Sequence, residues 1–268
     1  MPVKNLLQGK TAIITGGTTG IGRAITLEYL RQGANVVVNH LDLARDRPHL
    51  ESLLAEARGL RAADAAAGTL EHLPGDVTDP ATGEALARHA ASRFGRLDIC
   101  VSNAGVCEFA EFLSTGADLF ARTVRTNLDG AFYVVQAAAR QMASQTPAGG
   151  SIIGVSSISA LVGGGRQVHY TPTKAGVLSL MQSCAVALGK HGIRCNALLP
   201  GTIRTQLNDE DLADDGKRAY MEGRIPLGRT GATTDMAGPA VFLACEELSG
   251  YVTGAQLLVD GGLFVNLQ

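Results

Sequence analysis

Seven short apolar runs divide the 268-residue chain, and helical patterns separate them. The runs span residues 10–15, 34–39, 73–77, 97–103, 149–157, 193–199 and 256–260. Short runs rich in Val, Ile and Leu indicate strands buried on both faces, and their alternation with helices indicates a parallel sheet. We see no linker and no internal repeat. We therefore predict one α/β domain over 1–268, with a doubly wound seven-stranded parallel sheet and helices on both faces.

The first run, Lys10–Thr15, leads into a glycine-rich turn and then a helical pattern. A strand, a glycine turn and a helix in this order bring backbone N–H groups and the positive end of a helix dipole to an anion. A tight turn without a ligand is the alternative. We favour a Rossmann-like nucleotide fold, in which the coenzyme diphosphate contacts Gly16, Thr18, Thr19, Gly20, Ile21 and Gly22.

Polar and small residues close the other runs, at the edge where doubly wound sheets bind ligands. We expect Asn39 and His40 near the adenosine ribose, and Asp76 and Val77 near the adenine. Asp76 alone could equally be the N-cap of the helix after Pro80. The fourth run ends in residues small enough to leave room for a ribose: Asn103, Ala104 and Gly105.

The second run bears on the choice of coenzyme. An acidic residue at its end would accept from the ribose 2′-hydroxyl of NAD. The chain has Asn39-His40-Leu41-Asp42 there, in which Asn39 is neutral and His40 could become cationic. Arg45 and Arg47 are near enough in sequence to reach a 2′-phosphate. We interpret this as tolerance of NADP, with NAD also accepted, and it does not decide which coenzyme is preferred.

Tyr170 and Lys174 are four residues apart in the helical pattern Tyr170–Leu188, so they share a helix face. A phenol has a pKa of about 10, and a neighbouring ammonium lowers it toward the range of a useful base. Ser157 closes the fifth run and meets this pair only if the predicted sheet forms. Asn127 has apolar neighbours inside the long helical pattern Leu119–Met142, which indicates a buried polar role.

Two segments are harder to interpret. Residues 43–72 predict one or two surface helices and an Ala-rich loop around 62–68. Residues 202–231 show no strand pattern, and we read them as a helical flap over the strand ends or a plain surface excursion. This segment carries an acidic patch of Asp209, Glu210, Asp211, Asp214 and Asp215. Wide apolar stripes on 119–142 and 170–188 could either pack between subunits or cover the sheet.

The bulk composition excludes several classes of partner. The net charge of −2 gives no reason to expect nucleic acid or an anionic membrane. The five cysteines form no CxxC pair, so buried reduced thiols are favoured over disulfides or a metal site. Met1–Lys10 lacks the apolar run of a signal peptide, and no apolar stretch is long enough to span a bilayer. We expect a cytoplasmic protein.

In this order the motifs resemble those of the short-chain dehydrogenase/reductase superfamily over nearly the whole chain. The resemblance covers a TGxxxGxG turn at Thr15–Gly22, an NAG motif at Asn103–Gly105 and a PG motif at Pro200-Gly201. The superfamily's catalytic tetrad matches Asn127, Ser157, Tyr170 and Lys174. The resemblance implies a homotetramer that uses NADP, NAD or both.

The resemblance also implies a role for each residue. Tyr170 would be the general base, Lys174 would lower its pKa and hold the nicotinamide ribose, and Ser157 would hydrogen-bond the reacting oxygen. Asn127 would fix a water that connects Lys174 to solvent. The nicotinamide end would be held by Pro200, Gly201, Ile203 and Thr205. Substrate contacts are expected from Ser157, Gln167, Tyr170 and Thr202, with Arg166, His169 and Asn208 as further candidates.

Several stretches are similar to a narrower group within the superfamily, the L-rhamnose 1-dehydrogenases. They are 101–113, 151–164, 169–183, 192–205, 220–228 and 254–268, whereas 43–72 departs from that group. The similarity implies oxidation of an aldose, most of all L-rhamnose, at C1 to its lactone. Two alternatives stay open: reduction of a 3-oxoacyl carrier-protein ester, and a nucleotide-binding regulator without chemistry. The acidic patch disfavours the first, and the presence of Tyr170 and Lys174 disfavours the second.

Overall fold

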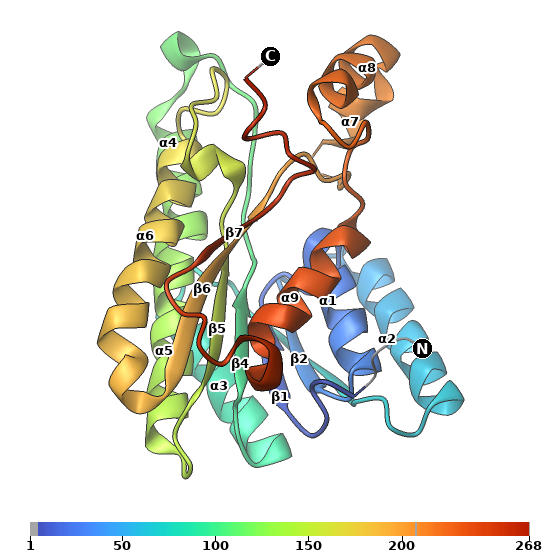
Figure 1. Ribbon diagram of the computed structural model, residues 1–268, viewed down its shortest axis with the longest axis vertical. Coiled ribbons are helices and arrows are strands. Elements are labelled where there is room, and N and C mark those ends of the chain that lie inside the picture. Colours follow the sequence, from blue (N-terminus) through green and yellow to red (C-terminus); the bar gives the residue numbers. More distant parts are fainter. Residues whose placement is uncertain (1–4, 207, 268) are drawn as a thin grey trace.

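The sheet has seven strands in the order β3-β2-β1-β4-β5-β6-β7, and every pair is parallel. The computed structural model (Figure 1) describes residues 5–206 and 208–267, apart from the side chains of residues 210 and 211. The strands are β1 Thr11–Ile14, β2 Asn35–His40, β3 Leu70–Pro74, β4 Ile99–Ser102, β5 Gly150–Val155, β6 Ile193–Pro200 and β7 Gln256–Val259. The strand order reverses between β1 and β4, which is where doubly wound sheets bind ligands.

Helices cover both faces of this sheet (Figure 1). One face packs against α1 Gly20–Arg31, α2 Arg47–Ala63 and α9 Ala237–Ala244. The other packs against α3 Pro80–Phe94, α5 Gly130–Ser144 and α6 Thr171–Leu188. The shorter helices are α4 Ala117–Val124, α7 Asp209–Ala213, α8 Asp215–Arg224 and α10 Glu246–Ser249. The predicted Rossmann-like fold is confirmed.

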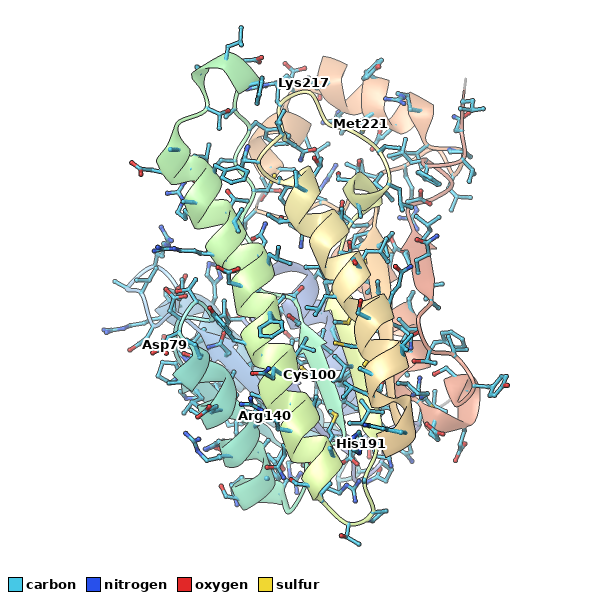
Figure 2. All side chains as sticks on the ribbon, turned by 90° about the vertical axis from the view of Figure 1, so that its left-hand side faces the viewer. Asp79, Cys100, Arg140, His191, Lys217 and Met221 are labelled. Carbon is cyan, nitrogen blue, oxygen red and sulfur yellow. The ribbon has the colours of Figure 1, made fainter. Side chains whose placement is uncertain are left out.

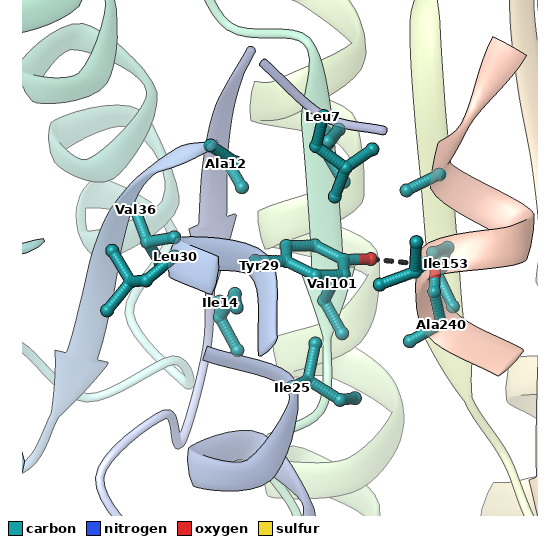
Figure 3. Packing of buried hydrophobic residues seen from close by; sticks show 14 of the residues in the cluster. Leu7, Ala12, Ile14, Ile25, Tyr29, Leu30, Val36, Val101, Ile153 and Ala240 are labelled. Atoms are coloured by element: carbon teal, nitrogen blue, oxygen red, sulfur yellow. Dashed lines mark hydrogen bonds between the residues drawn. The ribbon is translucent and has the colours of Figure 1, made fainter. Parts of the chain in front are cut away.

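Each face buries its own apolar cluster. Tyr29 of α1 is fully buried in one of them, and its hydroxyl donates to the carbonyl oxygen of Ala240 in α9 at 2.9 Å (Figure 3). A buried phenol is tolerated because its polar end has this partner. In Figure 2, α5 and α6 run side by side over the second cluster. Among the described residues no helix is long and apolar enough to cross a membrane.

Two details of the sequence interpretation were wrong in the third strand region. The strand was expected at 73–77 but lies at Leu70–Pro74, as an edge strand in which alternate residues face solvent. Its half-exposed pattern hides it among polar residues, and Pro74 is tolerated because no strand pairs on its outer side. Asp76 is not the N-cap of α3. Asp79 is the N-cap, and its carboxylate accepts from the backbone N–H of Ala81 at 2.9 Å.

The segment 43–72 contains the single helix α2, a loop and the first residues of β3. The apolar stripe of α6 proves to cover the sheet, because Val177, Leu178, Met181 and Ala185 are all buried. The reading of this stripe as a subunit contact is therefore not supported. The long pattern 119–142 is interrupted by a π-helical turn at Arg125–Asp129, between α4 and α5.

Arg194 of β6 is buried, and its guanidinium holds the carboxyl end of α9. It pairs with the carboxylate of Glu246 at 3.1 Å. Its nitrogens also donate to the Oγ of Ser249 and to the carbonyl oxygens of Leu243, Ala244 and Val252. The last carbonyls of a helix have no partner within it, and Arg194 supplies donors to those of Leu243 and Ala244. The hydroxyls of Ser151 and Ser249 donate to the carbonyl oxygens of Leu243 and Phe242 as well.

We expect Arg194→Met to lower the free energy of unfolding by about 3 kcal/mol, because the hydrogen bonds from the charged guanidinium to the carbonyl oxygens of Leu243, Ala244 and Val252 are lost. The measurement is urea denaturation of both proteins. Glu246→Gln is the matched control: this carboxylate is 73% exposed, so its loss should cost under about 1 kcal/mol. Equal losses in the two variants would contradict the role given to the guanidinium.

Candidate active site

The turn between β1 and α1 requires glycine at several of its positions. A Cβ on Gly22 would lie 2.3 Å from the carbonyl oxygen of Gly16 and 2.6 Å from Nδ2 of Asn103. Gly16 and Gly20 have φ values of +61° and +55°, which favour glycine. The turn therefore folds tightly against Asn103, and the free N–H groups at the start of α1 beside it suit a diphosphate. The residues present fit a dinucleotide.

Asn103 braces this turn from the end of β4. Its Nδ2 donates to the carbonyl oxygens of Thr15 at 2.9 Å and Gly16 at 3.2 Å. The Thr15 hydroxyl in turn accepts from the backbone N–H groups of Asn103 and Ala104, each at 3.0 Å. Thr15 was absent from the predicted site. Its position directly before the glycines was a usable signal, because a hydroxyl there can cross-link two strand ends.

A cavity of about 800 Å³ opens at the carboxyl ends of the strands. The predicted residues that line it are Gly16, Thr19, Gly20, Ile21, Asn103, Ala104, Gly105, Ser157, Gln167, Tyr170, Lys174, Pro200, Gly201, Thr202, Ile203 and Thr205. The predicted residues Thr18, Gly22, Asn39, His40, Asp76, Val77 and Asn127 are not part of its lining. The topology has thus brought the phosphate turn and the expected catalytic groups to one space.

Ser157, Tyr170 and Lys174 meet where β5 ends beside the start of α6. The hydroxyls of Ser157 and Tyr170 share a hydrogen bond. The Lys174 Nζ lies 5.5 Å from the centre of the Tyr170 ring and donates to the carbonyl oxygen of Val155 at 2.9 Å. The Ser156 hydroxyl donates to the carbonyl oxygen of Lys174 at 2.7 Å, which ties α6 to β5.

The electrostatics differ from the sequence expectation. Burial raises the pKa of the Tyr170 phenol, and the hydrogen bond with Ser157 opposes this only in part. Burial also lowers the pKa of Lys174 to about 8, because the ammonium has little water around it. The expected lowering of the phenol pKa by Lys174 is therefore not present in the protein alone. The missing element was burial, which a sequence pattern does not report.

Asn127 is buried in the π-helical turn and is linked through Thr173 to the backbone of Tyr170. Its Oδ1 accepts from the backbone N–H of Val106 at 2.8 Å, and its Nδ2 donates to the Val106 carbonyl oxygen at 2.9 Å. Nδ2 also donates to the hydroxyl of Thr173, which donates to the carbonyl oxygen of Tyr170 at 2.7 Å. Thr173 is a second residue that the sequence analysis missed. π-Helical turns are frequent at functional sites.

The adenosine end of the strand edge contains a histidine pair. Nε2 of His40 lies 3.1 Å from Nδ1 of His72, and the His40 Nδ1 accepts from the backbone N–H of Asp42. Burial, followed by the neighbouring His72, lowers the pKa of His40. His40 is therefore neutral near pH 7, so the idea of a cationic His40 at a 2′-phosphate is not supported. The Asn39 amide donates to the carbonyl oxygen of Gly75 at 2.8 Å.

The segment 202–231 begins and ends at one point, because Ile203 and Gly231 form a β-bridge. Between them α7 and α8 lie at the carboxyl end of the sheet (Figure 1), and Met221 of α8 (Figure 2) lines the cavity. The C-terminal residues 263, 264, 266 and 267 line it too. The Asn266 Nδ2 donates to the carbonyl oxygen of Arg224 at 2.9 Å. No pattern in the sequence indicated that the tail would reach the site.

Three further substrate candidates either lie outside the cavity lining or have side chains that are already hydrogen-bonded within the protein. Arg166 is paired with Glu111 at 3.2 Å and lies outside the cavity lining. His169 is buried and does not line the cavity either. Asn208 lines the cavity, but its amide is bonded to the backbone of Ile203 and Thr205. In the acidic patch, the side chains of Glu210 and Asp211 lie outside the described residues.

The described residues contain neither a disulfide nor a cluster of metal-binding side chains. All five cysteines carry free thiols, of which Cys100, Cys195 and Cys245 are buried. Among the described residues, no three His, Cys, Asp or Glu side chains are grouped to hold a metal ion.

The lowered pKa of Lys174 gives a pH dependence of stability. Between pH 8 and the ordinary lysine value of 10.5 the unfolded chain binds a proton at Lys174 that the folded chain does not. Raising the pH through this window therefore favours the folded state. Relative to Lys174→Met, the wild-type free energy of unfolding should rise by on the order of 3 kcal/mol across the window. A constant difference in urea titrations at several pH values would contradict the assignment.

Comparison with known proteins agrees with this geometry. The family profile described as Enoyl-(Acyl carrier protein) reductase matches residues 16–264. An L-rhamnose-1-dehydrogenase of Scheffersomyces stipitis is 59% identical over 98% of this chain and 99% of its own. An L-rhamnose 1-dehydrogenase (NAD(P)(+)) of Sphingomonas sp. is 54% identical with the same coverage. The structure of a short-chain type dehydrogenase/reductase from Mycobacterium marinum superposes with a TM-score of 0.86, at 36% identity and 96% coverage of both chains.

Proposed function

This chain belongs to the short-chain dehydrogenase/reductase family, and on that basis we propose that it oxidises L-rhamnose at C1 with NAD(P)+. The products are L-rhamnonolactone, the reduced coenzyme and a proton. The observation that carries the proposal is the cavity of about 800 Å³, which residues of the glycine-rich turn line together with Ser157, Tyr170 and Lys174. The relatives at 59% and 54% identity supply the choice of sugar.

In this mechanism Ser157 and Tyr170 hold the C1 hydroxyl between their own hydroxyls, and Tyr170 takes its proton. When bound, the coenzyme supplies the hydride acceptor. Lys174 would hold the nicotinamide ribose. Because burial dominates the pKa of the Tyr170 phenol in the protein alone, we assign any stabilisation of the phenolate by the Lys174 charge to the complex with coenzyme and sugar. Asn127, held by Val106 and Thr173, keeps a proton path between Lys174 and solvent. The ring oxygen of the sugar donates electron density to the forming carbonyl, which makes C1 the easiest carbon to oxidise.

The coenzyme would lie along the strand ends, from the adenosine at β2 to the nicotinamide at β6. The turn 16–22 would hold its diphosphate, Asp76 and Val77 would contact the adenine, and 103–105 would leave space for the ribose. Pro200, Gly201, Ile203 and Thr205 would hold the nicotinamide end. No acidic residue ends β2, and His40 is neutral, so both NAD and NADP are accommodated. Ser157, Gln167, Tyr170 and Thr202 contact the sugar.

The two alternative functions are less well supported. An acyl carrier protein is acidic and would be repelled by Asp209, Asp214 and Asp215, which are exposed on the segment 202–231. A regulator without chemistry has no use for the Tyr170–Lys174 arrangement at the cavity.

We further propose that 1–268 is one domain with residues 202–231 as a flap, and that it works as a cytoplasmic homotetramer. Five free thiols fit a reducing compartment. Outward-facing apolar side chains on the two long helices are available for subunit contacts: Phe132 on α5 is 44% exposed and Val186 on α6 is 87% exposed. Sedimentation of the purified protein would give the assembly state directly.

The test of function is a panel of aldoses assayed with NAD+ and with NADP+, following absorbance of the reduced coenzyme. We expect the highest kcat/KM with L-rhamnose and measurable rates with both coenzymes. Acetoacetyl thioesters with reduced coenzyme serve as the competing substrate class. The proposal would be overturned if the protein turned over the thioesters but neither L-rhamnose nor any other aldose.

A further inference from the structure

Cys107 and Gln167 face each other in the wall of the cavity. The Gln167 Nε2 donates to the Cys107 sulfur at 3.3 Å, and both residues line the cavity together with Ser157 and Tyr170. Burial raises the pKa of the Cys107 thiol, so the sulfur is uncharged near pH 7. A thiol is a weak acceptor and a weak donor. The carboxamide therefore contacts the sulfur through its N–H group, which is a stronger donor than the S–H group of the thiol.

The backbone of Gln167 is locked to the catalytic tyrosine. Its carbonyl oxygen accepts from the N–H groups of Tyr170 at 2.8 Å and Thr171 at 2.9 Å, at the start of α6. Its own N–H donates to the carbonyl oxygen of Gly164 at 3.0 Å. The Gln167 side chain is thus attached to the backbone about one helical turn before Tyr170. Any sugar hydroxyl that it touches is held in a set position relative to the reacting C1.

The loops that carry the pair form one rigid wall. The N–H of Ala110 donates to the carbonyl oxygen of Arg166 at 3.0 Å, and the Arg166 guanidinium pairs with Glu111 at 3.2 Å. The same guanidinium stacks over the Phe109 ring, 5.7 Å from its centre. Of these contacts, the Cys107–Gln167 bond is the one formed between two cavity-lining side chains.

The other end of the carboxamide is also accommodated. A Cβ on Gly164 would lie 2.7 Å from the Gln167 Oε1, so the glycine leaves room for this oxygen. With the oxygen beside Gly164 and one N–H on sulfur, the second N–H of Nε2 is the group left to meet a ligand. Sugar hydroxyl oxygens are better acceptors than a thiol sulfur.

We propose that Cys107 is a specificity-determining residue: it holds the Gln167 carboxamide nitrogen-first toward the cavity, so that Gln167 donates to one ring hydroxyl of the aldose. This rests on the proposed function, because it assumes a sugar in the cavity. The thiol is a positioning group and takes no part in proton or hydride transfer.

The test measures kcat/KM for the aldose that the wild type turns over fastest and for analogues that each lack one ring hydroxyl. Gln167→Met identifies the hydroxyl that Gln167 contacts, as the one whose removal from the sugar no longer lowers kcat/KM in this variant. For that hydroxyl, Cys107→Ala should reduce the wild-type discrimination by roughly 10-fold, the worth of about one hydrogen bond, through KM rather than kcat. Cys107→Ser restores an acceptor and should keep most of the discrimination. Cys184→Ser, outside the cavity lining, is the control and should match the wild type.

An equal loss of kcat/KM for the parent sugar and all analogues in Cys107→Ala would overturn the inference, because packing alone acts on every sugar alike. So would a loss through kcat with unchanged KM. Since the parent sugar is chosen by turnover, failure with L-rhamnose would overturn the substrate proposed above and leave this comparison intact.

Discussion

Tyr170→Phe is expected to slow turnover by roughly 10²- to 10⁴-fold, the usual worth of a positioned general base. The change removes one oxygen, the partner of the Ser157 hydroxyl. The ring stays in place, since Tyr170 is held through its backbone at the start of α6. Coenzyme affinity should therefore change little, because the turn 16–22 is untouched.

Single-turnover rates with saturating sugar and coenzyme separate these effects, and fluorescence titration of the reduced coenzyme measures its affinity. Tyr133→Phe on α5 is the matched control, because this tyrosine is outside the cavity lining and should leave turnover unchanged. A Tyr170→Phe enzyme within 10-fold of the wild-type rate would mean that another group takes the proton.

Gly22→Ala is the second large effect that we expect. The added methyl would lie 2.3 Å from the carbonyl oxygen of Gly16, a backbone atom that cannot rotate away. Gly16 must shift, and with it the Asn103 amide that is bonded to the same carbonyl. Such overpacking costs about 1–3 kcal/mol. Because the shift displaces the turn that is proposed to hold the diphosphate, affinity for the reduced coenzyme should fall by roughly 10- to 100-fold.

The control for Gly22→Ala is Gly59→Ala in α2, where a Cβ would meet no atom within 4 Å. Alanine also has the higher helix propensity, so this variant should be at least as stable as the wild type and bind coenzyme normally. Calorimetric titration of the two variants gives the comparison. Unchanged coenzyme affinity in Gly22→Ala would argue against a diphosphate in this turn.

Much of the fold could be predicted because the strands in the sheet interior are buried on both faces and read as continuous apolar runs. The edge strand β3 was misplaced by three residues for the opposite reason. Its pattern is half polar, and Pro74 looks like a strand breaker until the unpaired edge is known. The N-cap of α3 was assigned to Asp76 as an alternative, but Asp79 is the residue directly before Pro80.

The candidate site divides in the same way. Tyr170 and Lys174 could be paired from their helical spacing, and the glycine turn from its place between a strand and a helix. Thr15 and Thr173 were missed, because their hydroxyls act on residues 88 and 46 positions away in the bonds to Asn103 and Asn127. The C-terminal tail reaches the cavity through contacts with distant residues, such as the bond from Asn266 to the carbonyl oxygen of Arg224.

By itself the sequence determined the α/β pattern, the phosphate turn and the chemical types of the reacting groups, because these depend on neighbours within about one helical turn. The tertiary structure decided what happens to those groups. It buries Lys174 and Tyr170, which lowers the pKa of Lys174 and raises that of Tyr170. It also lowers the pKa of His40. Finally, it brings Cys107 into hydrogen-bond contact with Gln167, 60 residues away in the sequence. Burial and long-range hydrogen bonds are properties of the packed chain, and no local pattern encodes them.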